Sequence, residues 1–194
     1  LDTSSKASAT RKKQEGDYFD SSFTYGLTLN RLNQNYQPTD GYRTAFIQSI
    51  PIVSDDVALE NAITLSKYHQ VKDNLILSTQ FYIKNINSIS DKDVRISKRL
   101  FAPQRKLRGF EPGKVGPKDG SEHIGGNYVA TLNLISTLPG LFPQLQDIDF
   151  SLFLDSANVW GVDYDSSLDS SKIRSSTGIA IEWYTPIGPL SFSF

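Results

Sequence analysis

A period of two governs most of this chain. In its clearest segment, Ile179, Ile181 and Trp183 alternate with Ala180 and Glu182. Successive side chains of a β-strand point to opposite faces, so such a segment has one apolar face and one polar face. An apolar face against lipid and a polar face against a water-filled interior are the pattern of a transmembrane β-barrel. The alternation therefore predicts strands, and it favours lipid as the neighbour of the apolar face.

Eight segments show this alternation, and turn-forming residues separate them. They are 23–32, 42–53, 61–71, 75–86, 127–138, 147–160, 172–184 and 190–194. No stretch approaches the roughly 20 apolar residues of a membrane helix. We therefore predict an all-β fold, an antiparallel transmembrane β-barrel to which this chain supplies about eight strands.

The connections between the predicted strands fall into two sets. The compact set is 34–41, 72–74, 139–146 and 185–189, and the more polar set is 54–60, 88–126 and 161–171. Short turns at one end and longer loops at the other are typical of a transmembrane barrel. Residues 1–20 are predicted to be a polar loop or tail, and residues 21–194 the barrel unit, into which the long loop 88–126 is inserted.

Composition excludes several classes of function. The net charge of −1 gives no electrostatic case for binding nucleic acid. The absence of cysteine excludes disulfides and thiolate metal sites. The hydrophobic content of 38% is low for a soluble domain but suits a barrel with a polar interior.

No catalytic or metal-binding constellation stands out. His69 lies in a predicted strand and His123 in the long loop, without metal-ligand spacing. The acidic residues Asp163, Asp165 and Asp169 are predicted to belong to a solvated loop. We predict no enzymatic activity, no cofactor and no metal. A small outer-membrane barrel enzyme, with His, Asp and Ser at its outer rim, is the competing functional class.

The long loop contains the motif Leu107-Arg108-Gly109-Phe110. This motif resembles the Val-Arg-Gly-Phe signature in the sixth extracellular loop of the BamA family, the outer-membrane β-barrel assembly factors. Four further segments resemble the family and lie in the family's order. They are Tyr36-Gln37-Pro38-Thr39-Asp40-Gly41, Val115-Gly116-Pro117, Gly125-Gly126-Asn127 and Trp183-Tyr184-Thr185-Pro186-Ile187-Gly188-Pro189-Leu190.

The resemblance implies that the loop folds back into the barrel lumen, where Arg108 reaches Asp155 on the inner wall. The alternation independently places Asp155 and Phe153 on the polar face of their strand. A guanidinium inside a lumen needs an anion, and its planar fork suits a carboxylate. Gly109 would allow the loop tip a conformation that other residues avoid, and Phe110 would pack against the inner wall.

One position departs from the family pattern. Asn133 stands where a glutamate is common on the strand after the loop. An amide can accept a hydrogen bond from Arg108, but it supplies no charge. We therefore expect the anchor to depend more heavily on Asp155. Gly125 and Gly126 are expected to close the loop.

The resemblance implies a barrel of sixteen strands, of which this chain looks like strands eight to fifteen. The family alignment places Phe194 inside the penultimate strand, so the first and last strands and the periplasmic repeats are expected to be missing. A barrel normally abolishes its strand edges by closing. We therefore predict an open, curved sheet, or closure across a non-native seam.

The implied function is the folding and insertion of β-barrel proteins into the bacterial outer membrane. The implied partners are outer-membrane lipids, client β-barrel proteins and accessory assembly lipoproteins. Two sister barrels stay open as alternatives, a TamA-like barrel and a two-partner-secretion transporter. The distant alternative is a self-contained eight-stranded outer-membrane barrel that serves as an enzyme or an adhesin.

Overall fold

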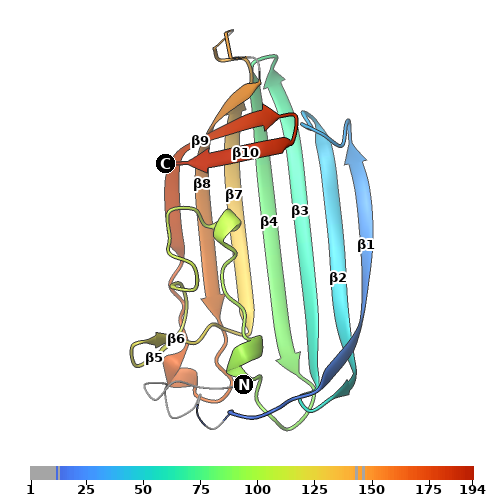
Figure 1. The fold of residues 1–194 in the computed structure, drawn as a ribbon, viewed down its shortest axis with the longest axis vertical. Helices are drawn as coiled ribbons and strands as arrows, with labels where there is room; N and C mark the ends of the chain where they lie inside the picture. Colours follow the sequence, from blue (N-terminus) through green and yellow to red (C-terminus); the bar gives the residue numbers. More distant parts are fainter. Residues whose placement is uncertain (1–11, 13, 143, 146) are drawn as a thin grey trace.

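Eight long strands form one curved antiparallel sheet in the computed structural model of this chain, which describes residues 12, 14–142, 144–145 and 147–194. Each long strand pairs with the next one along the chain, in the order β1-β2-β3-β4-β7-β8-β9-β10 (Figure 1). The strands are β1 (Asp20–Leu32), β2 (Gly41–Ser54), β3 (Ala58–Lys72), β4 (Leu75–Ser88), β7 (Tyr128–Leu138), β8 (Ile148–Trp160), β9 (Arg174–Thr185) and β10 (Gly188–Ser193).

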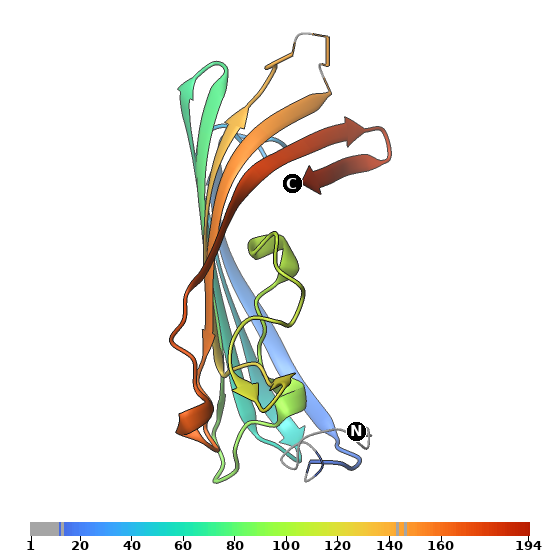
Figure 2. The same ribbon diagram turned by 90° about the vertical axis from the view of Figure 1, so that its left-hand side faces the viewer.

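The sheet is open. Among the described residues, β1 and β10 each pair with a strand on one side only. Figure 2 shows that the hairpin of β9 and β10 curls over the concave side near one end, while the long loop lies over the same side further along. The open, curved sheet that the sequence predicts is therefore what the structure contains.

The predicted all-β antiparallel fold is confirmed, and all eight predicted strands are present. Several boundaries differ by one to three residues. For example, β1 begins at Asp20 rather than at residue 23, and β3 begins at Ala58, where the sequence predicts a loop as far as residue 60. Ala58 pairs with Ser88 at the end of β4, so only residues 55–57 remain as a turn. No helix within the described residues is long and apolar enough to cross a bilayer.

The long loop has secondary structure that the alternation does not predict. It contains the 3-10 helices η1 (Ile96–Lys98) and η2 (Gln104–Lys106) and a small hairpin of β5 (Lys118–Asp119) and β6 (Glu122–His123). A further 3-10 helix, η3 (Ser166–Leu168), follows β8. Two or three residues are too few to show a hydrophobic period, so these elements leave no trace in the sequence pattern.

The two faces of the sheet differ in polarity, as the alternation predicts. On β7 and β8, Leu132, Leu134, Leu152 and Leu154 are exposed on the convex face. The residues between them face the other way and are covered by the loop. An exposed apolar band on one face of antiparallel strands is the surface that a membrane barrel presents to lipid.

The core lies between the concave face and the loop that covers it. Three small apolar clusters fill this space. They are Ile86, Val94, Leu100, Val129 and Val159; Ile96, Ile124 and Val162; and Leu107, Val115 and Ala157. Each cluster joins residues of the long loop to residues of β4, β7 or β8, or to Val162 after β8. The loop is therefore packed against the inner face of the sheet.

Candidate functional site

Two glycines form the neck of the long loop, where its two ends come together. Leu100 and Gly126 form an antiparallel bridge with N···O distances of 2.7 and 3.0 Å. Gly126 also lies against β8, and a Cβ there would be 2.3 Å from the carbonyl oxygen of Trp160. Gly125 has φ +68°, a backbone conformation that favours glycine. These close approaches let the loop turn inward immediately after it leaves the sheet.

Beyond the neck, Arg108 follows η2 by two residues and binds Asp155 of β8 on the inner wall. Its Nε and Nη2 atoms donate to the two carboxylate oxygens at 2.7 Å each, and its backbone N–H donates to Oδ2 at 3.1 Å. The Asp155 side chain is 0% exposed and that of Arg108 is 17% exposed. A bidentate pair with so little water around it is strong, and removal of either partner leaves an uncompensated charge.

Asn133 of β7 supports the acid rather than the arginine. It lies directly opposite Asp155 in the β7–β8 register. Its Nδ2 donates to Asp155 Oδ1 at 2.7 Å and to the carbonyl of Lys106 at 2.8 Å, while its Oδ1 has no hydrogen-bond partner. The expected acceptance of a hydrogen bond from Arg108 is therefore not what the structure contains. Asp155 has a further acceptor site to fill, and an amide donor fills it without adding charge.

The rest of the motif packs around this pair. The Cζ atom of Arg108 lies 3.6 Å from the centre of the Phe153 ring, a cation–π contact. Gly109 has φ +79°, a backbone conformation that favours glycine. A Cβ there would lie 3.8 Å from the Cβ of Ser176, so a side chain would have room and only the backbone conformation requires glycine. Phe110 packs on the cluster that contains Leu107.

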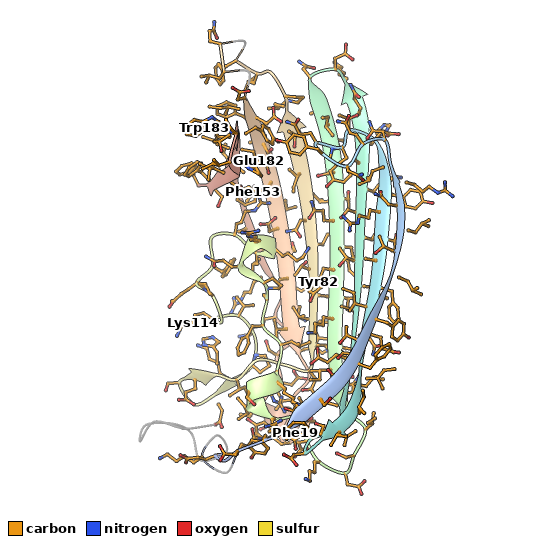
Figure 3. The ribbon with its side chains drawn as sticks, turned by 45° about the vertical axis from the view of Figure 1, so that its right-hand side comes forward. Phe19, Tyr82, Lys114, Phe153, Glu182 and Trp183 are labelled. Atoms are coloured by element: carbon orange, nitrogen blue, oxygen red, sulfur yellow. The ribbon has the colours of Figure 1, made fainter. Side chains whose placement is uncertain are left out.

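The loop and the inner wall also meet on β4, at Tyr82. The Nζ atom of Lys106 lies 5.2 Å from the centre of the Tyr82 ring. Figure 3 labels Tyr82 and Phe153 on different strands of the sheet, so the tip of the loop contacts the wall over a broad area. Burial lowers the pKa of Lys106 from its ordinary value.

A second cluster of charges lies at the loop end of the sheet, and sequence reasoning missed it. Asp163, predicted to be solvated, forms an ion pair with Arg99, whose side chain is 0% exposed. It also accepts hydrogen bonds from the backbone N–H of Val94 at 2.8 Å and from Asn127 Nδ2 at 3.0 Å. Burial would raise the pKa of Asp163, but these hydrogen bonds and the Arg99 charge outweigh it and hold the pKa below its ordinary value.

The other members of the acidic run are engaged with their own loop. Asp165 accepts a hydrogen bond from the backbone N–H of Ser167 at 2.9 Å, and Asp169 accepts one from Gly161 at 2.7 Å. Among the described residues, no group of three His, Asp or Glu side chains is placed to hold a metal ion.

The two histidines lie far apart in the fold. His69 is on β3, 3.6 Å from Asp40 in the turn before β2, and His123 is in the small loop hairpin. Burial lowers the pKa of His123, and the nearby charges of Lys118 and Lys114 lower it further. The described residues therefore do not bring the histidines together, and the chemistry of the site is that of holding a loop.

These features define a class of protein: an antiparallel barrel wall with an apolar outer face and a loop docked against its polar inner face. The comparison with protein families agrees, because the Omp85 superfamily domain matches residues 1–194. The chain belongs to the Omp85 superfamily. The prediction that the chain is not an enzyme is also confirmed at the level of this family.

Individual relatives are similar over most of the chain. The outer membrane protein assembly factor BamA of Neorickettsia risticii is 27% identical over 98% of this chain, and a SAM50-like protein of Schizosaccharomyces pombe is 26% identical over 97%. The crystal structure of BamA from Haemophilus ducreyi lacking POTRA domains 1–3 matches 89% of this chain with a TM-score of 0.78 and 28% identity.

The chain spans less than half of the length of each of these proteins. The chain spans 26% of the Neorickettsia protein, 42% of the SAM50-like protein and 38% of the Haemophilus chain. The predicted resemblance to BamA is thus confirmed for the barrel region. Family membership also gives the broad location of the chain, which is an outer membrane.

Proposed function

We propose that this chain is the carboxy-terminal half of a BamA-type barrel that folds and inserts β-barrel proteins into the bacterial outer membrane. The observation that carries the proposal is the docked loop, in which Arg108 reaches across the concave face to Asp155. Membership of the Omp85 superfamily and relatives named as assembly factors support it. Residues 21–194 form the barrel unit in this proposal, and residues 1–20 precede it as a loop or tail.

The proposed role of the anchor is mechanical. Leu107, Arg108, Gly109 and Phe110 hold the loop against Phe153, Asn133 and Asp155, and the neck glycines Gly125 and Gly126 set the direction in which the loop leaves the sheet. A loop fixed in this way ties β7 and β8 to the interior and keeps the barrel in one shape. Clients would then add strands to a sheet edge, where backbone hydrogen bonds supply affinity for many sequences.

The proposed partners follow from this role. They are outer-membrane lipids on the apolar convex face, client β-barrel proteins, and the accessory lipoproteins of bacterial assembly machinery. The lipids have the most direct support, since the exposed leucines of β7 and β8 form the kind of apolar band that a membrane barrel presents to lipid. No enzymatic step, nucleotide or cofactor takes part.

A second candidate has a specific observation behind it. The SAM50-like relative matches 97% of this chain at 26% identity, close to the values for the bacterial relative. A barrel of that kind in the outer membrane of an organelle would use the same anchor. A complementation test separates these candidates. If the whole protein that contains this chain restores growth of a bacterium that lacks its own assembly factor, the bacterial proposal is favoured over this candidate and over a TamA-like or secretion barrel.

The direct test is a folding assay with the whole protein that contains this chain. It is reconstituted in vesicles of phosphatidylethanolamine and phosphatidylglycerol and given a urea-unfolded client barrel, and the folded client is followed by its heat-modifiable migration in gels. We expect faster folding than in empty vesicles. We expect Arg108→Ala to slow it by about tenfold or more, since each 1.4 kcal/mol of lost docking is a factor of ten.

The matched control is Arg105→Ala, which removes a neighbouring exposed arginine from the same loop. We expect this variant to fold clients at the parent rate. A parent protein that folds clients no faster than empty vesicles would refute the proposed function. Equal rates for Arg108→Ala and the parent would refute the role of the anchor.

A further inference from the structure

The first part of the long loop reaches two distant parts of the sheet at the same end. Residues 94–99 lie over the concave side, close to the segments that connect the strands at this end (Figures 1 and 2). Asp20 begins β1 and Asp163 follows β8, and these strands are separated by β2, β3, β4 and β7. The two acids thus belong to strands five spacings apart, about 24 Å along the sheet.

One arm of this segment holds the β1 side. Arg95, whose side chain is 8% exposed, forms ion pairs with Asp20 and with Asp56 in the β2–β3 turn. Its guanidinium lies 3.8 Å from the centre of the Tyr18 ring. Lys98 adds an ion pair to Asp20 at 2.7 Å. Two side chains of the loop therefore hold the start of β1, Tyr18 just before it, and the β2–β3 turn.

The other arm holds the β8 side. Arg99 pairs with Asp163, and its guanidinium also faces the ring of Tyr164 at 5.0 Å. Ile96 packs on Val162 in the same segment after β8. The charge of Arg99 has no exposed surface, so it is compensated only while this segment stays in place.

We propose that residues 94–99 act as a strap that sets the distance between the β1 side and the β8 side of the barrel at its loop end. Flattening of the sheet would separate Arg95 from Asp20 and Asp56, or it would separate Arg99 from Asp163. Either separation exposes a buried charge to water or leaves it without its partner. The strap is distinct from the anchor of Arg108, because it uses other residues of the loop and binds other acids. Its test does not depend on the proposed function.

The test measures the width of the sheet directly. Spin labels are attached to Val53→Cys on β2 and Ile173→Cys next to β9, two side chains that are 60% and 69% exposed, in a chain with no cysteine of its own. Any cysteine elsewhere in the whole protein is first replaced by serine. Pulsed electron paramagnetic resonance then gives the distance distribution between the labels in vesicles of phosphatidylethanolamine and phosphatidylglycerol.

The expected result is a graded series. Arg95→Gln should broaden the distribution and move it to longer distances, and Lys98→Gln should move it less in the same direction. The matched control is Lys92→Gln, because the Lys92 side chain donates a hydrogen bond to the carbonyl of Asp55 at 3.3 Å, in an exposed part of the same loop, and forms no ion pair among the described residues. We expect this variant to give the parent distribution.

Folding of every variant is checked by heat-modifiable migration. If Arg95→Gln fails to fold, Asp56→Asn removes the same ion pair from the other side and is read in the same way. A parent-like distribution in folded Arg95→Gln or Asp56→Asn would overturn the proposal, because the sheet would then set its own width. So would an equal shift in Lys92→Gln, which would show a general effect of charge.

Discussion

Two regions hold the long loop, and they are built differently. At the lumen anchor, one arginine, Arg108, makes three hydrogen bonds to one fully buried acid, Asp155. The second region, the rim, lies at the loop end of the sheet and consists of Arg95 and Arg99 of the strap with Asp20, Asp56 and Asp163. Arg95 pairs with two of these acids and Arg99 with the third, and the acids come from separate segments of the chain. The first arrangement concentrates the interaction in one pair, and the second distributes it over several.

This difference predicts different responses to damage. A buried pair that loses one partner leaves the other uncompensated, so a single substitution removes the whole interaction and adds a penalty. Arg95 has two acidic partners and Asp20 has two cationic partners, so the loss of one contact leaves another group to satisfy the charge. We therefore expect the lumen anchor to fail abruptly and the rim to loosen gradually.

The largest effect is expected from Arg108→Ala at the lumen anchor. It leaves the Asp155 carboxylate buried without its cation, and the docked loop should lose about 3–5 kcal/mol relative to the undocked loop. A protease of broad specificity should then cut the segment around η2, which is protected in the parent. The measurement is the cutting rate of the whole protein in vesicles, followed by mass spectrometry of the fragments.

Arg105→Ala serves as the control for this experiment, since Arg105 is an exposed residue of η2. It should leave the protection unchanged. Persistent protection in Arg108→Ala would mean that the apolar contacts of Leu107 and Phe110 dock the loop without the ion pair. The comparison between the two regions would then lose its basis.

The lumen anchor was predictable from the sequence because its parts are local. Arg108 belongs to a four-residue motif, and Asp155 lies in a strand whose period of two fixes the face on which it points. The eight strands were predictable for the same reason. The role of Asn133 was not, since only the strand register places its amide opposite Asp155.

The rim could not be predicted, because its residues share no period and no motif. Asp20, Asp56 and Asp163 come from three separate places in the chain and meet the arginines only after the sheet has curved. Each of these acids, taken alone, has the sequence context of a solvated turn residue. Only the three-dimensional arrangement distinguishes Asp163, which pairs with Arg99, from Asp165, which caps a turn of its own loop.

The next largest effect is expected at the neck, the bridge between Leu100 and Gly126. In the chain, Leu100 lies between the strap and the motif that contains Arg108. Gly126→Ala would place a Cβ 2.3 Å from the carbonyl oxygen of Trp160, and the backbone atoms there cannot move aside easily. We expect a loss of about 3 kcal/mol, the upper range for an overpacked site. The measurement is the midpoint temperature of the heat-modifiable transition in detergent.

Gly120→Ala is the matched control, because no atom lies within 4 Å of its would-be Cβ. Its φ of +61° makes alanine unfavourable, by about 1–2 kcal/mol. The midpoint should therefore fall less than in Gly126→Ala. An equal fall in both variants would indicate that backbone conformation, and not the contact with β8, limits the neck.

A smaller effect is expected from Asn133→Asp, which sharpens the description of the lumen anchor. The change keeps the shape of the side chain but replaces the donor 2.7 Å from Asp155 with a second carboxylate. The variant loses the hydrogen bonds to Asp155 and Lys106, so docking should weaken by about 2 kcal/mol. Protease protection of the loop should lie between that of the parent and that of Arg108→Ala. Protection equal to the parent would show that Arg108 neutralises both acids without help from an amide.

The smallest effect is expected at the rim, from acidification. The lowered pKa of Asp163 means that its carboxylate contributes fully above its ordinary value of 3.8. That contribution is lost as the pH falls through the lowered pKa. The Asp163 side chain is 25% exposed, so its charge is partly screened by water, and the loss should be smaller than at the lumen anchor. The probe is a spin label at Ser167→Cys, in the loop that Asp163 holds, whose mobility reports the loosening.

The comparison with Asp163→Asn isolates this residue from the other acids of the rim. Between pH 7 and pH 5 the label should be more mobile in Asp163→Asn than in the parent, by a constant amount. As the pH falls below 3.8 and through the lowered pKa of Asp163, the parent should approach the variant, because its own Asp163 becomes neutral. The other acids of this region are the same in both proteins, so their effects cancel in the difference. A difference that stays constant to the lowest pH at which both proteins remain folded would mean that Asp163 holds its loop through shape and hydrogen bonds alone. In that case the charge of Asp163 would not contribute to holding its loop, although Asp163 forms an ion pair with Arg99. The rim would then differ from the lumen anchor, where we expect the charge of the acid to be essential.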